Sequence, residues 1–367
     1  MYVRIITNVC LLFFVVAWPH QAEAQRWLFV SLKQDRAVVT FSRDEATGEL
    51  TRIRQQFCPA EPAIMCTSPD RRTLFVSFRS SGELASFRID PATGLLTLLR
   101  VVPGGRDPAY LLPDHTGRFL LSAYYVDNRV AVHAIASDGS LSEAAVQMVP
   151  TAQNAHGMAV DSTNRLVFVT HTGANRIFQF RFDPEQGRLA AADPEFVAAA
   201  PGAHPRHIVL HPSDRWAYVN NEAADSLTVY AVNRAEAQLS PLQTVPTLPA
   251  GVDGAGNATA RCEMTLDGRY VYVANRGHDS IAGFAIDQET GRVNPLGQTA
   301  TEPTPRSFSI TPSGRYLYAA GERSGRLAAY RRHDDGSLSP LRTYEVGREP
   351  WSVLAVDTLV PHAVPAD

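Results

Sequence analysis

The chain has 367 residues, of which 45% are hydrophobic and 19% charged, and its formal net charge is −3. This near-neutral charge and the lack of a basic run in the sequence argue against nucleic acid as a partner. Neither a linker nor a low-complexity tract divides the sequence, so a single folded domain is expected although the length would allow two.

The N-terminus has the pattern of a secretory signal peptide. An apolar run over Val9–Trp18 follows an arginine, and Ala22 and Ala24 then frame a small-x-small cleavage site. The run is too short to span a membrane comfortably. We predict a signal peptide at residues 1–24, cleaved after Ala24, and a mature domain at residues 25–367 that is periplasmic or secreted and not stably bound to the membrane. The alternative is an anchor retained in the membrane.

The rest of the chain repeats one segment, in which a proline leads a hydrophobic run, a turn, a second run, a polar gap and a third run. Six copies cover residues 62–87, 108–133, 155–180, 205–230, 260–284 and 305–330. A period of about 45–55 residues with several short strands is typical of a β-propeller blade. A seventh copy begins at Pro350 and stops, and its missing strands match Arg26–Phe41. We therefore predict an all-β, seven-bladed β-propeller whose last blade is closed by N- and C-terminal strands.

Each copy is expected to form four antiparallel strands, A to D from the centre outward. In the fourth copy, Ile208–Leu210 falls in A, Trp216–Val219 in B and Leu227–Ala231 in C, and the stretch after Gln238 supplies D. Val, Ile, Tyr and Phe fill these runs, as strands prefer. Asp-Arg, Asn-Arg and Gly-Arg pairs indicate A–B turns with positive φ. Asp-x-x-x-Gly motifs between C and D are interpreted as structural turns.

Three cysteines would remain after cleavage: Cys58, Cys66 and Cys262. An odd number excludes a complete disulfide framework. Cys58 and Cys66 are close enough in sequence to form a bridge, and buried free thiols are the alternative. No cysteine has metal-ligand or catalytic spacing.

The start of A and the end of B lie on one face of the ring, at the mouth of the central channel, because the two strands are antiparallel. The ring of residues at the start of A contains Ala63, Ala109, His156, Arg206, Arg261, Arg306 and Trp351. The ring at the end of B contains Lys33 or Leu32, Arg79, Tyr124, Thr172, Glu222, Arg276 and Glu322. These positions differ from copy to copy, which indicates a site built on a symmetric scaffold. The arginines predict an anionic ligand, because guanidinium pairs with carboxylate or phosphate at two points.

Several stretches resemble the seven-bladed propeller lactonase family, which includes propeller-type 6-phosphogluconolactonases and the fungal carboxymuconate lactonizing enzyme. They are His-Pro-Arg-His at 204–207, His-Pro-Ser-Asp at 211–214, Asn-Asn-Glu at 220–222, the run at 267–281 that contains Asn-Arg-Gly-His-Asp-Ser-Ile, and Thr-Pro-Arg-Ser-Phe at 304–308. The resemblance extends over essentially the whole mature chain. The Asn-Arg-Gly-His-Asp-Ser-Ile stretch is its most specific part.

The resemblance implies a site of one histidine, two arginines and a glutamate, which match His156, Arg206, Arg276 and Glu222. The alignment of the repeats selects the same four residues, and we predict them to be catalytic. The predicted substrate-binding residues are Arg79, Tyr124, His171, His207, Arg306 and Glu322.

Two departures from the family pattern lie at the mouth. Asn154-Ala155-His156 replaces a common His-x-His, and His171 replaces a common aspartate. Because a phosphorylated pentose-pathway lactone is a cytosolic metabolite, the signal peptide favours an exported aldonolactone hydrolase.

Lactone hydrolysis needs a base to activate water and a cation for the oxyanion. Glu222 and His156 are the candidate acid–base groups, and Arg206 and Arg276 would hold a carboxylate or the oxyanion. The predicted reaction uses neither a metal nor another cofactor, because the histidines lack metal-ligand spacing.

Each of these residues also has a structural interpretation. Glu222 and Arg276 could form an ion pair between blades, His156 could be a hydrogen-bonded strand-end residue, and Arg206 could support blade contacts.

The leading hypothesis is an extracytoplasmic lactone hydrolase, a carboxylic-ester hydrolase that acts on a small sugar-derived or carboxylated lactone. A muconate-type lactonizing cycloisomerase would use the same groups. A non-catalytic ligand-binding propeller is the third possibility. A monomer is the default expectation for the oligomeric state.

Overall fold

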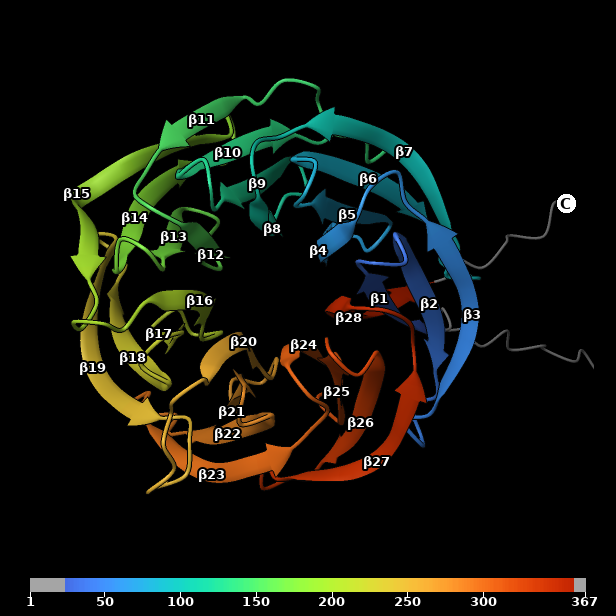
Figure 1. Cartoon of the computed structure of the whole chain (residues 1–367). Coiled ribbons are helices and arrows are strands. Elements are labelled where there is room, and N and C mark those ends of the chain that lie inside the picture. The colour runs from blue at the N-terminus through green and yellow to red at the C-terminus, as the bar shows by residue number, and fades with distance from the viewer. Residues whose placement is uncertain (1–23, 360–367) are drawn as a thin grey trace, which may run out of the picture.

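The computed structural model describes residues 24–359, which form a ring of seven four-stranded antiparallel sheets (Figure 1). This confirms the predicted all-β, seven-bladed propeller. In this range no helix is long and apolar enough to cross a membrane. The predicted signal peptide lies outside the described residues except for Ala24, which is the first residue of β1.

The blades are numbered from the first complete repeat, with their strands running from the centre outward. Blade 1 contains β4 (Pro62–Thr67), β5 (Thr73–Phe78), β6 (Glu83–Ile89) and β7 (Leu96–Pro103). Blade 2 contains β8 (Pro108–Pro113), β9 (Phe119–Tyr124), β10 (Arg129–Ala134) and β11 (Gln147–Pro150). Blade 3 contains β12 (Ala155–Val160), β13 (Leu166–His171), β14 (Arg176–Asp183) and β15 (Arg188–Ala198).

The fourth blade contains β16 (Pro205–Leu210), β17 (Trp216–Asn221), β18 (Ser226–Asn233) and β19 (Gln238–Pro246), as the sequence predicts. Blade 5 contains β20 (Ala258–Met264), β21 (Tyr270–Arg276), β22 (Ser280–Ile286) and β23 (Val293–Ala300). Blade 6 contains β24 (Pro305–Ile310), β25 (Tyr316–Gly321), β26 (Arg326–Arg332) and β27 (Leu338–Glu345). Blade 7 contains β28 (Pro350–Leu359), β1 (Ala24–Leu32), β2 (Ala37–Arg43) and β3 (Leu50–Phe57).

The two ends of the described chain close the ring within blade 7. The C-terminal strand β28 pairs antiparallel with β1, so that Val353 lies opposite Val30 and Leu359 opposite Ala24. Figure 1 shows β28 as the inner strand of this sheet, next to β1. The predicted closure by N- and C-terminal strands is confirmed.

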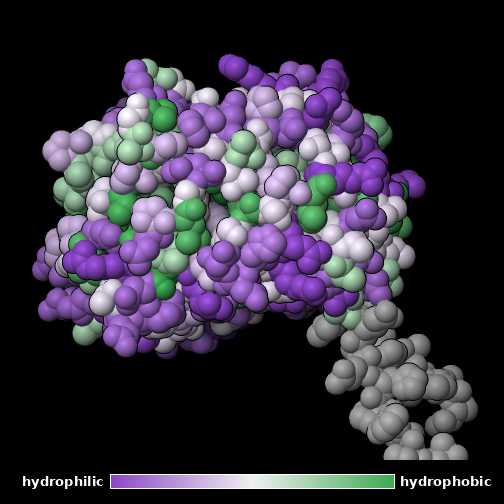
Figure 2. Space-filling view, turned by 90° about the horizontal axis from the view of Figure 1, so that it is seen from below, coloured by the Kyte–Doolittle hydropathy of each residue, from purple (hydrophilic) through white to green (hydrophobic). Residues whose placement is uncertain are grey.

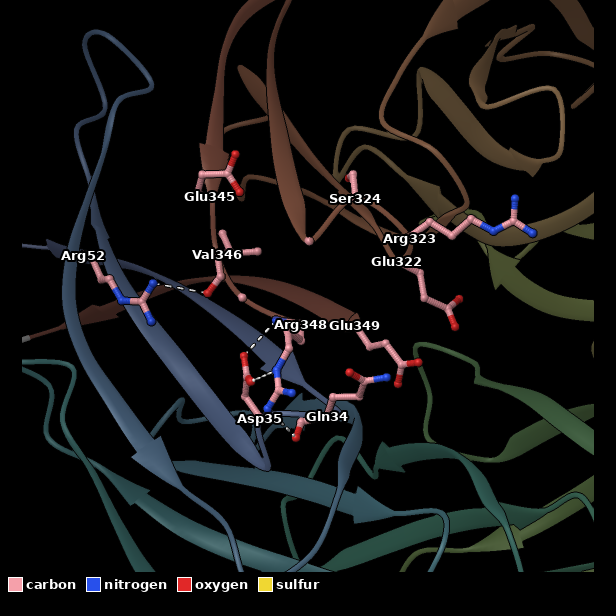
Figure 3. Close-up of a pocket in the computed structure, with 12 residues that line it drawn as sticks. Gln34, Asp35, Arg52, Glu322, Arg323, Ser324, Glu345, Val346, Arg348 and Glu349 are labelled. Carbon is pink, nitrogen blue, oxygen red and sulfur yellow. Dashed lines mark hydrogen bonds and ion pairs between the residues drawn. The ribbon is translucent and has the colours of Figure 1, made fainter.

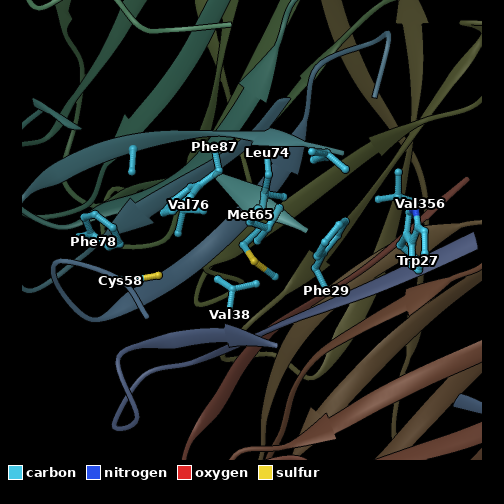
Figure 4. Packing of buried hydrophobic residues seen from close by; sticks show 13 residues of the cluster. Trp27, Phe29, Val38, Cys58, Met65, Leu74, Val76, Phe78, Phe87 and Val356 are labelled. Atoms are coloured by element: carbon cyan, nitrogen blue, oxygen red, sulfur yellow. The ribbon is translucent and has the colours of Figure 1, made fainter. Parts of the chain in front are cut away.

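Apolar side chains pack between neighbouring blades. Figure 4 shows the cluster between blades 7 and 1, where Trp27 and Phe29 of β1 lie in one buried cluster with Leu74 and Val76 of β5. Burying such side chains contributes about 1.5–3 kcal/mol each. Contacts between blades therefore hold the ring together, in addition to the strand pairing within blade 7.

The C–D turns take part in this packing. Each turn of the Asp-x-x-x-Gly type lies against an aromatic residue in strand B of the preceding blade. The Tyr218 hydroxyl donates a hydrogen bond of 2.8 Å to the Gly291 carbonyl, and Tyr318 bonds the Gly48 carbonyl in the same way at 2.7 Å. A Cβ atom at Gly291 would overlap the indole of Trp216. These glycines are thus required at the blade interface as well as in the turn.

The predicted A–B turns are confirmed, since Asp214 has a φ of 54° and Asn164 a φ of 59°. A second irregularity lies at the start of the inner strands. The pairing of β16 with β17 shifts between Pro205 and His207, so Arg206 is an extra, unpaired residue. Bulges of this kind re-aim side chains. The same shift occurs in blade 6 around Arg306.

Cys58, Cys66 and Cys262 are free thiols, which excludes the bridge between Cys58 and Cys66 in this structure. Burial raises the pKa of Cys58 to about 12, so this thiol is not ionised at neutral pH. The outer edge of the disc is mainly hydrophilic, with apolar residues scattered among polar ones (Figure 2).

Candidate active site

A small cavity lies at the centre of the ring, where the inner strands begin. Its lining contains Ile64, Arg79, Ala109, His156, Arg206, His207, Arg261, Arg306, Ser307 and Trp351. The inner strands of all seven blades contribute these residues, and Arg79 follows the second strand of blade 1. The two predicted rings of residues therefore meet at one channel mouth.

Glu222 lies between two arginines from adjacent blades. One of its oxygens, Oε1, accepts a hydrogen bond from Nη2 of Arg276 and lies 3.6 Å from Nε of Arg206. Glu222 follows β17 and Arg206 belongs to the bulge of β16, so both come from blade 4, whereas Arg276 ends β21 of blade 5. A single carboxylate thus faces two cations, and one positive charge remains uncompensated.

The arginines keep Glu222 ionised. Burial by itself would raise the pKa of this carboxyl, but the charges of Arg206 and Arg276 and the hydrogen bond from Arg276 outweigh it and lower the pKa below its usual value. A carboxylate held in this way is a weak base. Its main effect is to orient the two guanidinium groups.

Arg206 is almost completely buried and is held on its inner side. Its Nη1 donates to the Ala260 carbonyl at 2.6 Å and contacts Nε2 of His207 at 3.1 Å, where the guanidinium must be the donor. Its Nε is buried and has no hydrogen-bond partner among residues 24–359. Burial lowers the pKa of Arg206 against the effect of Glu222, yet a guanidinium stays protonated in proteins. Arg206 therefore remains a cation in the lining of the cavity.

His156 is an acid–base group of the cavity whose side chain makes no hydrogen bond to the described residues. It is 4% exposed, and its Nδ1 has no hydrogen-bond partner among the described residues. The ring packs edge-on against Tyr125, with 5.9 Å between centroids, and lies 5.2 Å from the ring of His207. Burial and the charge of Arg206 lower the pKa of His156 well below its usual value. The imidazole is therefore neutral and can accept a proton.

Trp351 forms a wall of the mouth with cations around it. The Arg306 guanidinium lies 3.5 Å from the centre of its indole ring system, Lys33 Nζ at 5.1 Å and Arg79 at 5.7 Å. Such cation–π contacts hold these side chains in place. They also leave the edge of a flat aromatic surface beside the site.

The other cations at the mouth are already paired. Arg306 Nη1 lies 3.2 Å from Glu322 Oε2, and Lys33 Nζ lies 3.5 Å from Glu349 Oε2. Arg79 binds both oxygens of Asp107. The predicted arginine excess is therefore smaller than the sequence alignment suggests. The uncompensated charge belongs to the group of Arg206, Arg276 and Glu222.

Sequence reasoning missed two of these partners. Asp107 and Glu349 precede the first proline of an inner strand and adopt positive φ values of 61° and 49°. The sequence did contain a signal for these partners: each is an acidic residue directly before the proline that opens a repeat.

Three of the predicted substrate-binding residues lie outside the cavity lining. Glu322 lines a neighbouring groove and contacts the cavity residue Arg306, whereas Tyr124 and His171 lie away from the mouth. Tyr124 is fully buried, pairs with Pro108 and accepts a hydrogen bond from Ser122, and Tyr125 occupies the place at the mouth instead. His171 is also fully buried, and it contacts the Thr151 hydroxyl and the Phe178 ring. Both residues end a second strand and point into the packing of the blades.

Arg261 lies one position farther along its strand than the alignment of the repeats places it. Ala260 occupies the position that corresponds to Arg206, because Thr259 stands where the other copies have proline. Arg261 still lines the cavity, but its Nη2 pairs with Glu263 at 3.0 Å. Its charge is therefore compensated within its own strand.

The structure brings together His156, Arg206, Arg276 and Glu222, with His207, Arg79, Arg306 and Glu322 around them. His156 and Glu222 make no direct hydrogen bond within residues 24–359, and Arg206 and His207 connect them. In the same range no group of three or more His, Cys, Asp or Glu side chains is arranged to hold a metal ion. The site offers a neutral imidazole next to two cationic donors.

A closed propeller with acid–base and cationic groups at one channel mouth is the arrangement of a propeller hydrolase. The family described as "Lactonase, 7-bladed beta-propeller" matches residues 23–355. This chain belongs to that family, and the resemblance found in the sequence is confirmed. It is a carboxylic-ester hydrolase of the lactonase class.

Named relatives agree with this assignment. A 6-phosphogluconolactonase of Pectobacterium carotovorum is 34% identical over 261 residues, which cover 70% of this chain and 76% of the relative. One from Cronobacter sakazakii is 32% identical over 314 residues, 85% of this chain and 93% of the relative. Among solved structures, the periplasmic gluconolactonase PpgL of Pseudomonas aeruginosa is 29% identical, with a TM-score of 0.84 over 91% of this chain and 99% of that chain.

Proposed function

We propose that this chain hydrolyses the lactones of sugar acids outside the cytoplasm, without a metal ion. The observation that carries the proposal is the neutral His156 side chain, which lines the cavity without a hydrogen bond to the described residues, beside two arginines that share one carboxylate. The N-terminal signal pattern supports export. A similar protein, PpgL, is described as a periplasmic gluconolactonase.

In the proposed reaction, the neutral imidazole of His156 takes a proton from water as the water oxygen bonds to the lactone carbonyl carbon. Arg206 and Arg276 stabilise the negative charge on the carbonyl oxygen. When the tetrahedral intermediate collapses, the ring C–O bond breaks and the imidazolium returns its proton to the leaving alkoxide. Glu222 positions the arginines and does not exchange protons.

The charge of the site favours an unphosphorylated substrate. A single uncompensated positive charge matches a neutral lactone or the single charge of an aldonate product. A phosphate carries about −1.5 to −2 at neutral pH. The Asp107, Glu322 and Glu349 carboxylates would repel this second charge. We therefore expect glucono-1,5-lactone to react faster than its 6-phosphate.

The test is proton release from a panel of lactones by the purified mature chain, with and without a chelator. The panel should contain gluconolactone, galactonolactone, 6-phosphogluconolactone and muconolactones. His156→Gln and Glu222→Gln should each lower kcat by about two to three orders of magnitude. The matched controls His333→Gln and Glu289→Gln change exposed residues and should leave kcat unchanged.

Several results would contradict the proposal. A lack of turnover above spontaneous hydrolysis on every lactone would reject lactone hydrolysis, and inactivation by the chelator would reject metal independence. Full activity of His156→Gln would reject the assignment of the base. Ring closure of a muconate without lactone hydrolysis would identify the alternative, a cycloisomerase.

A further inference from the structure

We infer that the substrate is an aldonolactone carrying a second sugar residue, and that the second sugar binds in a groove beside the channel mouth. This inference rests on the proposed lactonase function and extends it. The groove has a volume of about 840 Å³ and lies between blades 6 and 7 (Figure 3). Pockets of ~300–1,000 Å³ enclose drug-sized ligands, so this groove has room for a sugar ring.

Two ion pairs connect the groove to the mouth. Glu322 and Glu349 line the groove, and they also pair with Arg306 and Lys33, the cations that lie over Trp351. Figure 3 shows both carboxylate side chains on the same side of the groove. A ligand whose lactone ring is held by Arg206 and Arg276 would pass Trp351 and these two carboxylates to reach the groove.

The lining matches a hydroxyl-rich, uncharged group. Its side chains combine three guanidinium groups with four carboxylates, an amide and a hydroxyl, and one side chain, Val346, is apolar. A sugar hydroxyl both donates and accepts hydrogen bonds, so it can use neighbouring groups of either sign. The excess of carboxylates disfavours a phosphate or a second carboxylate at this end of the substrate.

Part of this lining is available for binding. Within the described range, the side chains of Gln34 and Arg323 make no hydrogen bond or ion pair with the protein, and both are exposed. The Oε2 atom of Glu349 is buried without a hydrogen-bond partner, and its nearest cation is Lys33. By contrast, Arg348 is occupied by Asp35, with 2.6 Å between Nε and Oδ1. Gln34 and Arg323 are therefore the donors that a sugar would use.

The test compares kcat/KM for cellobiono-1,5-lactone and glucono-1,5-lactone, which share the reacting ring. The wild type should hydrolyse the disaccharide lactone at least as efficiently as gluconolactone. Gln34→Trp should fill the groove and lower the ratio of the two values by about tenfold or more, with gluconolactone hydrolysis unchanged. Arg323→Ala should lower the same ratio about tenfold or more, as expected for the loss of one hydrogen bond to a charged group.

Ser80→Trp is the matched control. Ser80 has the position of Gln34 in the repeat, but it lines a different groove, between blades 1 and 2, on the same face. This variant should leave the ratio unchanged. Equal losses in the two tryptophan variants, or rejection of the disaccharide lactone by an enzyme active on gluconolactone, would overturn the inference and leave the lactonase proposal intact. Inactivity on both lactones would instead overturn the proposed function, and the inference with it.

Discussion

At the scale of single residues, burial and neighbouring charges together decide which side chains of the site are ionised. Glu222 stays ionised because two arginines face it, although burial opposes its charge. His156 has no carboxylate contact of this kind, so burial keeps it neutral. Ionised and neutral forms of the candidate acid–base groups therefore coexist within one small cavity.

Two buried histidines away from the cavity should make the free energy of unfolding depend on pH. Burial lowers the pKa of His133 and of His171 to about 4. In the unfolded chain both would titrate near 6.5, so the unfolded state binds more protons between pH 6.5 and 4. Their contribution to stability is present above pH 6.5 and is lost as the pH falls toward 4. Between pH 7 and 5 we expect a loss of about 2 kcal/mol per histidine in the free energy of unfolding.

Urea unfolding at a series of pH values measures this effect. His133→Phe should remove one histidine's share of the acid slope, because phenylalanine keeps the ring and has no proton to bind. An unchanged slope in this variant would show that His133 does not titrate on unfolding.

At the scale of strands and turns, the same contact recurs between blades. A C–D turn glycine lies against an aromatic residue of strand B in the preceding blade, as at Gly291 with Trp216 and at Gly48 with Tyr316. A tyrosine two residues farther along that strand bonds the glycine carbonyl. The repeated Asp-x-x-x-Gly motif is therefore explained by packing between blades as well as by the turn.

Gly291→Ala tests this contact. Alanine would be strained by the φ of 72° and would also overlap Trp216. Gly202→Ala is the matched control, because Gly202 has the same φ and no atom within 4 Å of an added Cβ. The control should cost about 1–2 kcal/mol in the free energy of unfolding, and Gly291→Ala about 1–3 kcal/mol more. Equal losses in urea melts would show that the contact between the blades is unimportant.

At the scale of the whole molecule, the ring is closed by pairing the two ends of the described chain. β1 and β28 are more than 300 positions apart in the sequence but share one hydrogen-bonded sheet. The ion pair of Arg43 on β2 with Asp357 on β28 adds a contact across that sheet. Opening the ring therefore requires breaking backbone hydrogen bonds in addition to side-chain packing.

A circular permutant separates these two contributions. Leu359 and Ala24 are partners in the sheet, so a short linker can join them, and new ends can be placed at residues 58–61. Every blade is then continuous in the chain, and blades 7 and 1 meet through side chains alone. We expect the permutant to fold with the same circular dichroism spectrum and to unfold about tenfold faster in stopped-flow urea jumps. An unfolding rate equal to that of the wild type would show that strand pairing at the closure does not limit unfolding.

The repeats made much of this predictable. The repeated hydrophobic runs predict the strands of each blade, and their alignment points to His156, Arg206, Arg276 and Glu222. The alignment of the repeats was wrong by one residue in blade 2, where the sequence pattern was ambiguous. Two adjacent tyrosines, Tyr124 and Tyr125, end strand B of blade 2, and the hydrophobic pattern could not decide which of them faces the channel.

The sequence by itself determined the blade number, the closure and the face that carries the site, because these follow from the period of the repeat and the alternation of the strands. The tertiary structure alone decided which charges are compensated. Asp107 and Glu349 reach the mouth from loops that no repeat alignment pairs with Arg79 or Lys33. Ion pairing depends on distances of a few ångströms between blades, and spacing along the chain does not specify those distances.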